Sequence, residues 1–193
     1  ALGEGVVGTV ASLSAVVGVQ GWSAEAVFAG VAGIGLTFGM WWIYFVFPPA
    51  EILHARREGS FLFGYLHIVV FASIVATGAG LHAAAYYIEH HSELGSVATV
   101  LSVVVPVGVY ILMVYVVYAV MTHTVQRFHL LLLAGTAAVL GLAVALAANG
   151  VSMANCLLVV TLAPVVSVVG YELVGHRHVA HAVSSVSRGP DDV

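Results

Sequence analysis

Six long apolar stretches follow one another along the chain and leave little room for any other structure. They lie at about 1–20, 24–46, 60–87, 96–121, 129–148 and 151–174. A helix needs about 20 predominantly apolar residues to cross a bilayer. The strands of a membrane barrel have about 10 residues and alternate apolar with polar side chains, and these stretches do not. The sequence therefore predicts an all-α fold, a polytopic transmembrane helical bundle of six spans.

Charged residues are too scarce for a soluble domain. They make up 7% of the 193 residues, against roughly a quarter in soluble proteins. We therefore expect one bundle over residues 1–174 in the lipid bilayer, a cytoplasmic tail at 175–193 and no separate aqueous domain. Only 5 residues are basic and the formal net charge is -4. Such a chain offers no surface that could neutralise phosphates, which excludes nucleic acid as a partner.

Turn residues and the arginines predict the helix ends and the topology. Ser23 is expected to cap the second span, and Gly21 and Gly150 to lie in turns. Cytoplasmic loops carry an excess of basic residues, and six spans place every arginine on one side: Arg56, Arg57, Arg127, Arg177 and Arg188. We therefore predict that both ends are cytoplasmic. Because the apolar stretch at Ala1 has no charged segment before it, we expect the first span to begin upstream.

Three ionisable side chains inside the predicted spans qualify as functional candidates: Glu4, His67 and Glu172. A charged side chain at the bilayer centre costs about 2.5–3.5 kcal/mol on insertion scales, so each of these residues is a functional hypothesis. His67 lies about 10 Å from the inner end of its span, at 1.5 Å per residue. Glu172 lies near the cytoplasmic end, where its side chain could also extend to the headgroups. We predict that the three residues face a polar interior or a proton path.

The third span carries a stripe of polar and small residues. At 100° per residue, five of them fall within roughly 60° of one line, with Tyr86 at the margin: Ser60, His67, Gly78, His82 and Glu89. A surface that faces lipid would not carry these groups, so the stripe should face protein or a hydrated cavity. Histidines hydrogen-bonded inside a bundle would explain it as well as a proton path would.

Histidines and acidic residues gather where the third span ends. A weak zinc or copper site there would use His82, Glu89, His90 and His91, although a solvated helix end is the simpler interpretation. A haem would need two histidines that face each other at one depth, and none lies opposite His67. We expect no cofactor. Because no hydrolase, metalloprotease or P-loop motif occurs, we also expect no enzymatic activity.

Small residues and prolines indicate where spans could meet. Gly35 and Gly39 have the four-residue spacing that allows close helix approach in membranes, as do Ala11 and Ala15. Pro106 and Pro164 lie inside spans and each removes a backbone hydrogen bond. The carbonyls released by the two prolines are those of Ser102 and Val160, where we expect kinks.

Three motifs in order give the chain a family resemblance. They are LGEGVVG at 2–8, TFGMWWIYF at 37–45 and GYLHIVVFASIVATGAGLHAA at 64–84. Together they resemble the carboxyl half of the low temperature requirement A family of bacterial membrane proteins, whose members are about twice this length. The resemblance implies that six residues are characteristic: Glu4, Trp41, Trp42, Tyr44, Phe45 and His67. The serine that often follows the Gly-Glu pair is Gly5 here. The family brings no accepted activity with it.

Two functions follow as hypotheses. In the first, a multi-pass protein of the bacterial cytoplasmic (inner) membrane moves a small solute or ion together with protons, because carboxyl and imidazole groups at membrane depth can exchange protons. If Glu4 and His67 met within hydrogen-bond reach, a coupled proton-exchanging pair would be credible. In the second, the chain is a non-catalytic accessory or assembly subunit packed against a larger membrane complex, or a homo-oligomer. The Trp41–Trp42 pair also fits an aromatic belt at the membrane interface.

Overall fold

The computed structural model describes residues 3–46 and 59–175. The elements are α1 (Gly3–Gln20), α2 (Ala24–Val46), α4 (Ser60–Ile88), α5 (Ser96–Thr122), α6 (Arg127–Ala148), α7 (Met153–Gly170) and a π-helical turn, η2 (Tyr171–Gly175). No strand occurs in these residues, so the all-α prediction is confirmed. The predicted tail and every arginine except Arg127 lie outside them.

Five helices are long and apolar enough to cross a membrane: α2, α4, α5, α6 and the segment Met153–Leu173, which joins α7 to η2. The chain is thus a membrane protein with several spanning helices. The sixth expected span corresponds to α1, which has 18 residues and carries Glu4 in its first turn. Among the described residues, α1 is not one of the helices that are long and apolar enough to cross a membrane. Six spans and two cytoplasmic ends remain predictions.

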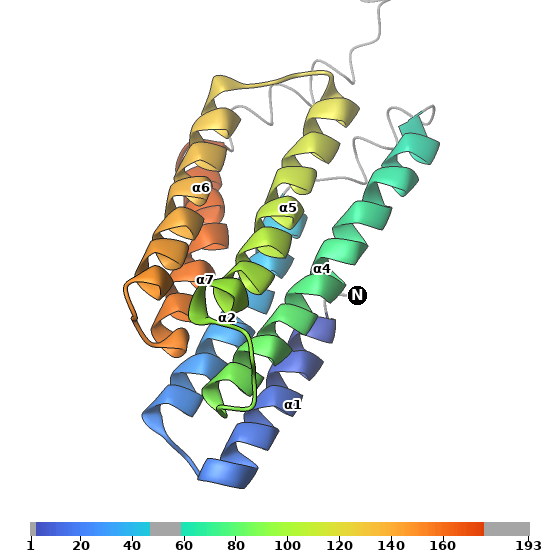
Figure 1. Ribbon diagram of the computed structural model, residues 1–193. Coiled ribbons are helices and arrows are strands. Elements are labelled where there is room, and N and C mark those ends of the chain that lie inside the picture. The colour runs from blue at the N-terminus through green and yellow to red at the C-terminus, as the bar shows by residue number, and fades with distance from the viewer. Residues whose placement is uncertain (1–2, 47–58, 176–193) are drawn as a thin grey trace, which may run out of the picture.

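Successive helices run in opposite directions and close into a ring (Figure 1). Each helix packs mainly on two neighbours, in the order α1, α4, α5, α6, α7, α2 and back to α1, while smaller contacts of α5 with α7 and α2 cross the ring. Half of the apolar window in α5 and in α7 is buried, against 28% in α6. The core therefore lies between α2, α5 and α7, where Leu36, Tyr110 and Val160 are fully enclosed.

The turns between helices follow the local sequence. Ser23 accepts a hydrogen bond at Oγ from the N–H of Ala26 at 3.1 Å, which confirms the predicted cap of α2. Gly21 and Gly150 adopt positive φ angles of 73° and 78°, a conformation that glycine enters without steric cost. These two turns therefore reverse the chain between α1 and α2 and between α6 and α7.

Helices α1 and α2 meet through two reciprocal glycine–threonine pairs. Gly5 faces Thr37 and Gly33 faces Thr9 so closely that a Cβ on either glycine would overlap the threonine side chain. Each threonine hydroxyl donates to the glycine carbonyl one turn earlier in its own helix, Thr9 to Gly5 at 2.6 Å and Thr37 to Gly33 at 2.9 Å. We call these four residues the glycine–threonine contact. Thr37 leaves no space for a side chain at position 5, so glycine fits there and the serine of the family motif would not.

Glycines also meet the two prolines. Gly39 of α2 faces the ring of Pro164, and Gly35 approaches Thr161 on the same face of α7, so the predicted interface at this glycine pair is confirmed. Gly80 of α4 faces the carbonyl oxygen of Ser102, which Pro106 has released from its helical hydrogen bond. The absence of a side chain on Gly80 therefore allows α4 and α5 to approach each other closely at this point.

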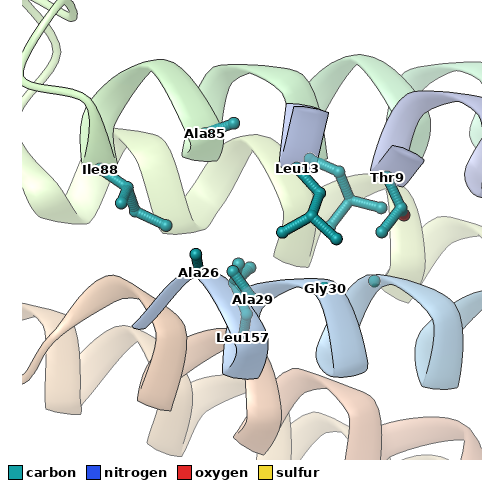
Figure 2. Close-up of a pocket in the computed structure, with 10 residues that line it drawn as sticks. Thr9, Leu13, Ala26, Ala29, Gly30, Ala85, Ile88 and Leu157 are labelled. Carbon is teal, nitrogen blue, oxygen red and sulfur yellow. The ribbon is translucent and has the colours of Figure 1, made fainter. Parts of the chain in front are cut away.

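A small cavity of about 20 Å³ lies between α1, α2, α4 and α7. Figure 2 shows that small and aliphatic side chains surround it, among them Leu13, Ala29, Ala85 and Leu157. Its one hydroxyl, on Thr9, already donates to Gly5. A cavity of this size has room for about one water molecule, which would need two or more polar partners. The cavity is therefore packing space and not a solute site.

Candidate functional site

A buried histidine of α4 forms a hydrogen bond with α2, near the carboxyl-terminal end of α2. His67 of α4 is 6% exposed, and its Nε2 lies 2.8 Å from the hydroxyl oxygen of Tyr44 on α2. Its Nδ1 lies 2.7 Å from the carbonyl oxygen of Phe63, one turn earlier in α4. Both ring nitrogens therefore have a partner at good hydrogen-bond distance. We call Tyr44 and His67 the tyrosine–histidine pair.

The Phe63 carbonyl decides which nitrogen of His67 carries the proton. A carbonyl oxygen can only accept, so Nδ1 must donate to it. In the neutral ring Nε2 is then the acceptor, and the hydroxyl of Tyr44 donates to it. If a second proton binds at Nε2, the direction reverses and Nε2 donates to the Tyr44 oxygen. The pair can thus exist in two hydrogen-bonded forms that differ by one proton.

Aromatic rings enclose the imidazole. The ring centroid of Phe63 lies 4.1 Å from that of His67, and those of Tyr44 and Phe71 lie 5.8 Å away. These rings limit the number of polar groups that can reach the imidazole. In such surroundings an unpaired imidazole would be costly, so the two hydrogen bonds are what allows His67 to be buried there.

A second tyrosine, Tyr110, forms a hydrogen bond with α2 one helical turn before Tyr44. Tyr110 of α5 is completely buried and donates its hydroxyl to the carbonyl oxygen of Met40 at 2.7 Å. Tyr44 follows Met40 by one helical turn, so this bond fixes the depth and rotation of α2 next to the site. The sequence analysis did not single out Tyr110, because its acceptor is a backbone group.

The aromatic motif of α2 divides between two environments. Tyr44 turns toward His67, whereas Trp41, Trp42 and Phe45 are each about half exposed on the outside of the bundle. Trp41 packs on Phe45, with ring centroids 5.2 Å apart. Of the six residues implied by the resemblance, the structure therefore brings two, Tyr44 and His67, into one contact.

Neither carboxylate predicted at membrane depth meets His67. Glu4 is exposed, and its backbone packs on Gly78 of α4. Gly78 lies eleven residues from His67, or about 16 Å along the helix axis. Glu172 is exposed in η2. Glu4 and His67 therefore do not form a coupled pair, because α1 contacts α4 near Gly78 and not near His67.

The stripe predicted on the third span is only partly internal. His67, Gly78 and Glu89 are buried, His82 is half-buried, and Ser60 is exposed. Tyr86, at its margin, is also exposed, and its ring stacks on that of His82 at 5.7 Å. His82 thus contacts an exposed aromatic side chain of its own helix.

The residues of the weak metal site do not converge as a group of four. Within the described residues, no three His, Cys, Asp or Glu side chains lie where they could hold one metal ion. Glu89 and His91 do approach each other, with Oε2 3.4 Å from Nδ1. His90 lies in the turn between them and is exposed.

A second histidine, His129, is buried although the sequence indicates a position at the inner boundary of its span. His129 of α6 is 6% exposed, and its ring centroid lies 5.3 Å from that of Tyr115 and 5.0 Å from that of Tyr118, both on α5. In the sequence His129 lies at the predicted start of a span, a place where a solvated side chain is the ordinary expectation. The spacing of Tyr115 and Tyr118, on one face of α5, is the signal that could have indicated a buried partner.

The fold and this site define the class: a multi-span helical membrane protein with a hydrogen-bonded histidine between two of its spans. The family model for the bacterial low temperature requirement A protein (LtrA) matches residues 1–164, and the chain belongs to this family. The matched range includes both residues of the tyrosine–histidine pair and confirms the resemblance. No curated protein and no solved structure matches the chain.

Proposed function

We propose that this protein is a non-enzymatic carrier of the bacterial cytoplasmic membrane, and that it moves protons together with a small solute or ion. One observation carries the proposal: His67 is buried with a tyrosine hydroxyl on the nitrogen where a proton would bind. An ionisable residue at membrane depth is costly and typically functional. Imidazole is also the side chain whose ordinary titration range includes physiological pH.

The geometry supports a proton-dependent change at the contact between α2 and α4. In the neutral form the Tyr44 hydroxyl donates to Nε2, and in the charged form Nε2 donates to Tyr44. Protonation therefore requires the hydroxyl hydrogen to turn away. The freed O–H must find another acceptor, which in a carrier would be a solute or water. Such a change would couple proton binding to the contact between α2 and α4.

The proposal is tested with the complete protein reconstituted in vesicles that contain a pH-sensitive dye. An imposed pH gradient and potential should give proton flux above that of protein-free vesicles. His67→Gln keeps a hydrogen-bonding group near Tyr44 but cannot titrate, and we expect flux at least tenfold lower. His82→Gln is the matched control on the same helix and should retain the flux of the unmodified protein. Equal flux in vesicles with and without protein, or in the two variants, would contradict the proposal.

A second function, that of an accessory subunit, draws support from the outer surface. Five aromatic side chains are about half or more exposed, and a larger membrane complex or another copy of the chain could cover them: Trp41, Trp42 and Phe45 of α2 and Phe61 and Tyr65 of α4. This function predicts no flux. It also predicts a stoichiometric partner after purification from native membranes in mild detergent. Mass spectrometry of such a preparation distinguishes a partner complex, a homo-oligomer and a single chain.

A further inference from the structure

One buried titratable side chain, that of His129, takes no part in the tyrosine–histidine pair. His129 lies two residues after the start of α6 and is 6% exposed. Helices α4 and α6 begin at the same end of the bundle (Figure 1), so His67 and His129 both lie near the beginning of helices that run in the same direction. The bundle therefore buries two imidazoles toward one end.

The two imidazoles have similar surroundings. Each faces tyrosine on the preceding described helix: His67 faces Tyr44 of α2, and His129 faces Tyr115 and Tyr118 of α5. The imidazole of His129 is tilted by 48° to the ring of Tyr115 and by 83° to that of Tyr118. An ionisable side chain buried in a membrane bundle is typically functional, and this applies to His129 as it does to His67.

Buried hydroxyl groups continue from His129 toward the middle of α6. The hydroxyl of Tyr115 interacts with the side chain of Ser167 on α7. Ser167 is 1% exposed, and its Oγ lies 3.4 Å from Oγ1 of Thr136, which is 3% exposed. Thr136 follows His129 by seven residues, about 10 Å along the axis of α6. We call Tyr115, Ser167 and Thr136, which belong to three different helices, the hydroxyl row.

The hydroxyl of Thr136 is held less tightly than those of two other buried threonines. Thr37 and Thr77 donate to the carbonyl one turn earlier in their own helix, at 2.9 Å and 2.8 Å. Thr136 instead approaches α7, where its Oγ1 lies 3.5 Å from the carbonyl oxygen of Ala163. This distance and the 3.4 Å to Ser167 both exceed the usual 2.5–3.0 Å of an O–H···O bond. The hydroxyl hydrogens of the row can therefore reorient at little cost.

The charged groups near His129 in the described part of the chain are exposed. Arg127 of α6 and Glu172 of η2 both lie at the surface. Tyr171 of η2 is buried near Tyr118, and the groups that face the imidazole from α5 are also tyrosines. Phenols are neutral at physiological pH. They neither hold the imidazole in its charged form, as a carboxylate would, nor repel a proton, as an arginine would.

We propose that His129 is a second proton-binding residue of the carrier, and that the hydroxyl row links its protonation to α7. This second site rests on the proposed function, because it serves a protein that moves protons. When a proton binds to the neutral ring, the hydroxyl of Tyr115 reorients. Ser167 and Thr136 then reorient in turn, because each hydroxyl can donate one hydrogen bond and accept others.

The hydroxyl row ends where α7 meets α2. The carbonyl of Ala163 lies beside Thr136, and the next residue, Pro164, packs its ring on Gly39 of α2. The same helix carries Tyr44, which bonds His67. Protonation of His129 thus acts on α7 at the point where α7 supports the helix of the first proton site.

The second proton site is tested by nitrogen NMR of the complete, histidine-labelled protein in lipid bilayers, over the pH range in which imidazole ordinarily titrates. The signals of His129 are assigned by their loss in His129→Gln or, if that variant does not fold, by their shift in Tyr118→Phe. We expect one protonated ring nitrogen at high pH and two at low pH. A ring that stays neutral over the whole range would overturn the proposal. This measurement does not depend on flux, so it separates the second site from the proposed function.

Vesicle flux tests the hydroxyl row. Thr136→Val removes a hydroxyl of the row, and we expect flux at least tenfold lower in this variant and in His129→Gln. Thr77→Val is the matched control, because Thr77 is equally buried but bonds its own helix. His123→Gln, at an exposed histidine in the turn before α6, should also retain full flux. Full flux in His129→Gln or in Thr136→Val, with flux lost in His67→Gln, would overturn this inference and leave the proposed function standing.

Discussion

The two halves of α4 contact their neighbours in different ways. In the second half, backbone meets backbone: Gly78 lies against Glu4 of α1, and Gly80 lies against the Ser102 carbonyl of α5. In the first half, α4 reaches α2 through the side chains of the tyrosine–histidine pair. Close backbone contacts cannot rearrange without separating the helices, whereas a side-chain hydrogen bond can break and reform. We call the half with close backbone packing the fixed half of α4, and the half with the side-chain hydrogen bond the adjustable half.

The largest effect should come from Gly80→Ala in the fixed half. The new Cβ would meet the backbone of Ser102, which cannot move without displacing α5. We expect a loss of about 3 kcal/mol in the free energy of unfolding, at the upper end for overpacked cores. Gly64→Ala on the same helix is the control, because its Cβ would meet nothing within 4 Å. Denaturant unfolding followed by tryptophan fluorescence measures both, and equal stability would contradict a fixed half.

A smaller loss is expected for Gly33→Ala in the glycine–threonine contact. Its Cβ would meet the side chain of Thr9, which can shift more easily than a backbone, so we expect about 1–2 kcal/mol. Adding Thr9→Gly removes the obstacle and should restore part of the stability. The same unfolding measurement on the single and double variants tests this. If the double variant is less stable than Gly33→Ala alone, the two residues do not pack as described.

Tyr110→Phe comes next, because it removes one hydrogen bond and leaves the packing intact. The Met40 carbonyl would keep its helical partner, so the expected loss is about 1 kcal/mol, within the range for a buried hydrogen bond. Met40→Leu changes the side chain of Met40 but keeps its backbone carbonyl as the acceptor. It is therefore the control for a substitution at this position of α2. If the two variants have the same stability as the unmodified protein, the hydroxyl of Tyr110 does not fix α2.

The sequence was sufficient to predict the helices but not to predict which of their side chains come into contact. Long apolar runs predicted a helix in each of the six ranges, and Ser23, Gly21 and Gly150 marked their turns, because these signals are local. The identity of the group beside His67 depends on how far α1 and α2 slide and rotate against α4. That is decided by contacts such as Gly5 on Thr37, whose spacing is common in a chain with 21 glycines. The sequence therefore indicated Glu4 as the residue to compare with His67, and only the placed helices identify Tyr44 as its partner.

Backbone acceptors were the other obstacle to prediction. Tyr110 bonds the carbonyl of Met40, and His67 bonds that of Phe63. Every residue has a carbonyl, so the sequence does not show which one a side chain will reach. The tautomer of His67 follows from the Phe63 carbonyl alone. It could be assigned only after the structure placed the ring.

The smallest change in stability is expected for Tyr44→Phe, and it separates the two halves most clearly. Hydrogen bonds between membrane helices average about 0.6 kcal/mol, so the unfolding curve should move little. Proton flux should fall much more than stability does. The reason is that His67 loses the hydroxyl that donates to Nε2 and that must turn away when a proton binds. Tyr65→Phe removes an exposed hydroxyl from α4 and is the matched control. Vesicle flux and unfolding are measured on the same preparations. A Tyr44→Phe protein that keeps full flux would show that the hydroxyl merely completes the packing, and the adjustable half would then be as static as the other.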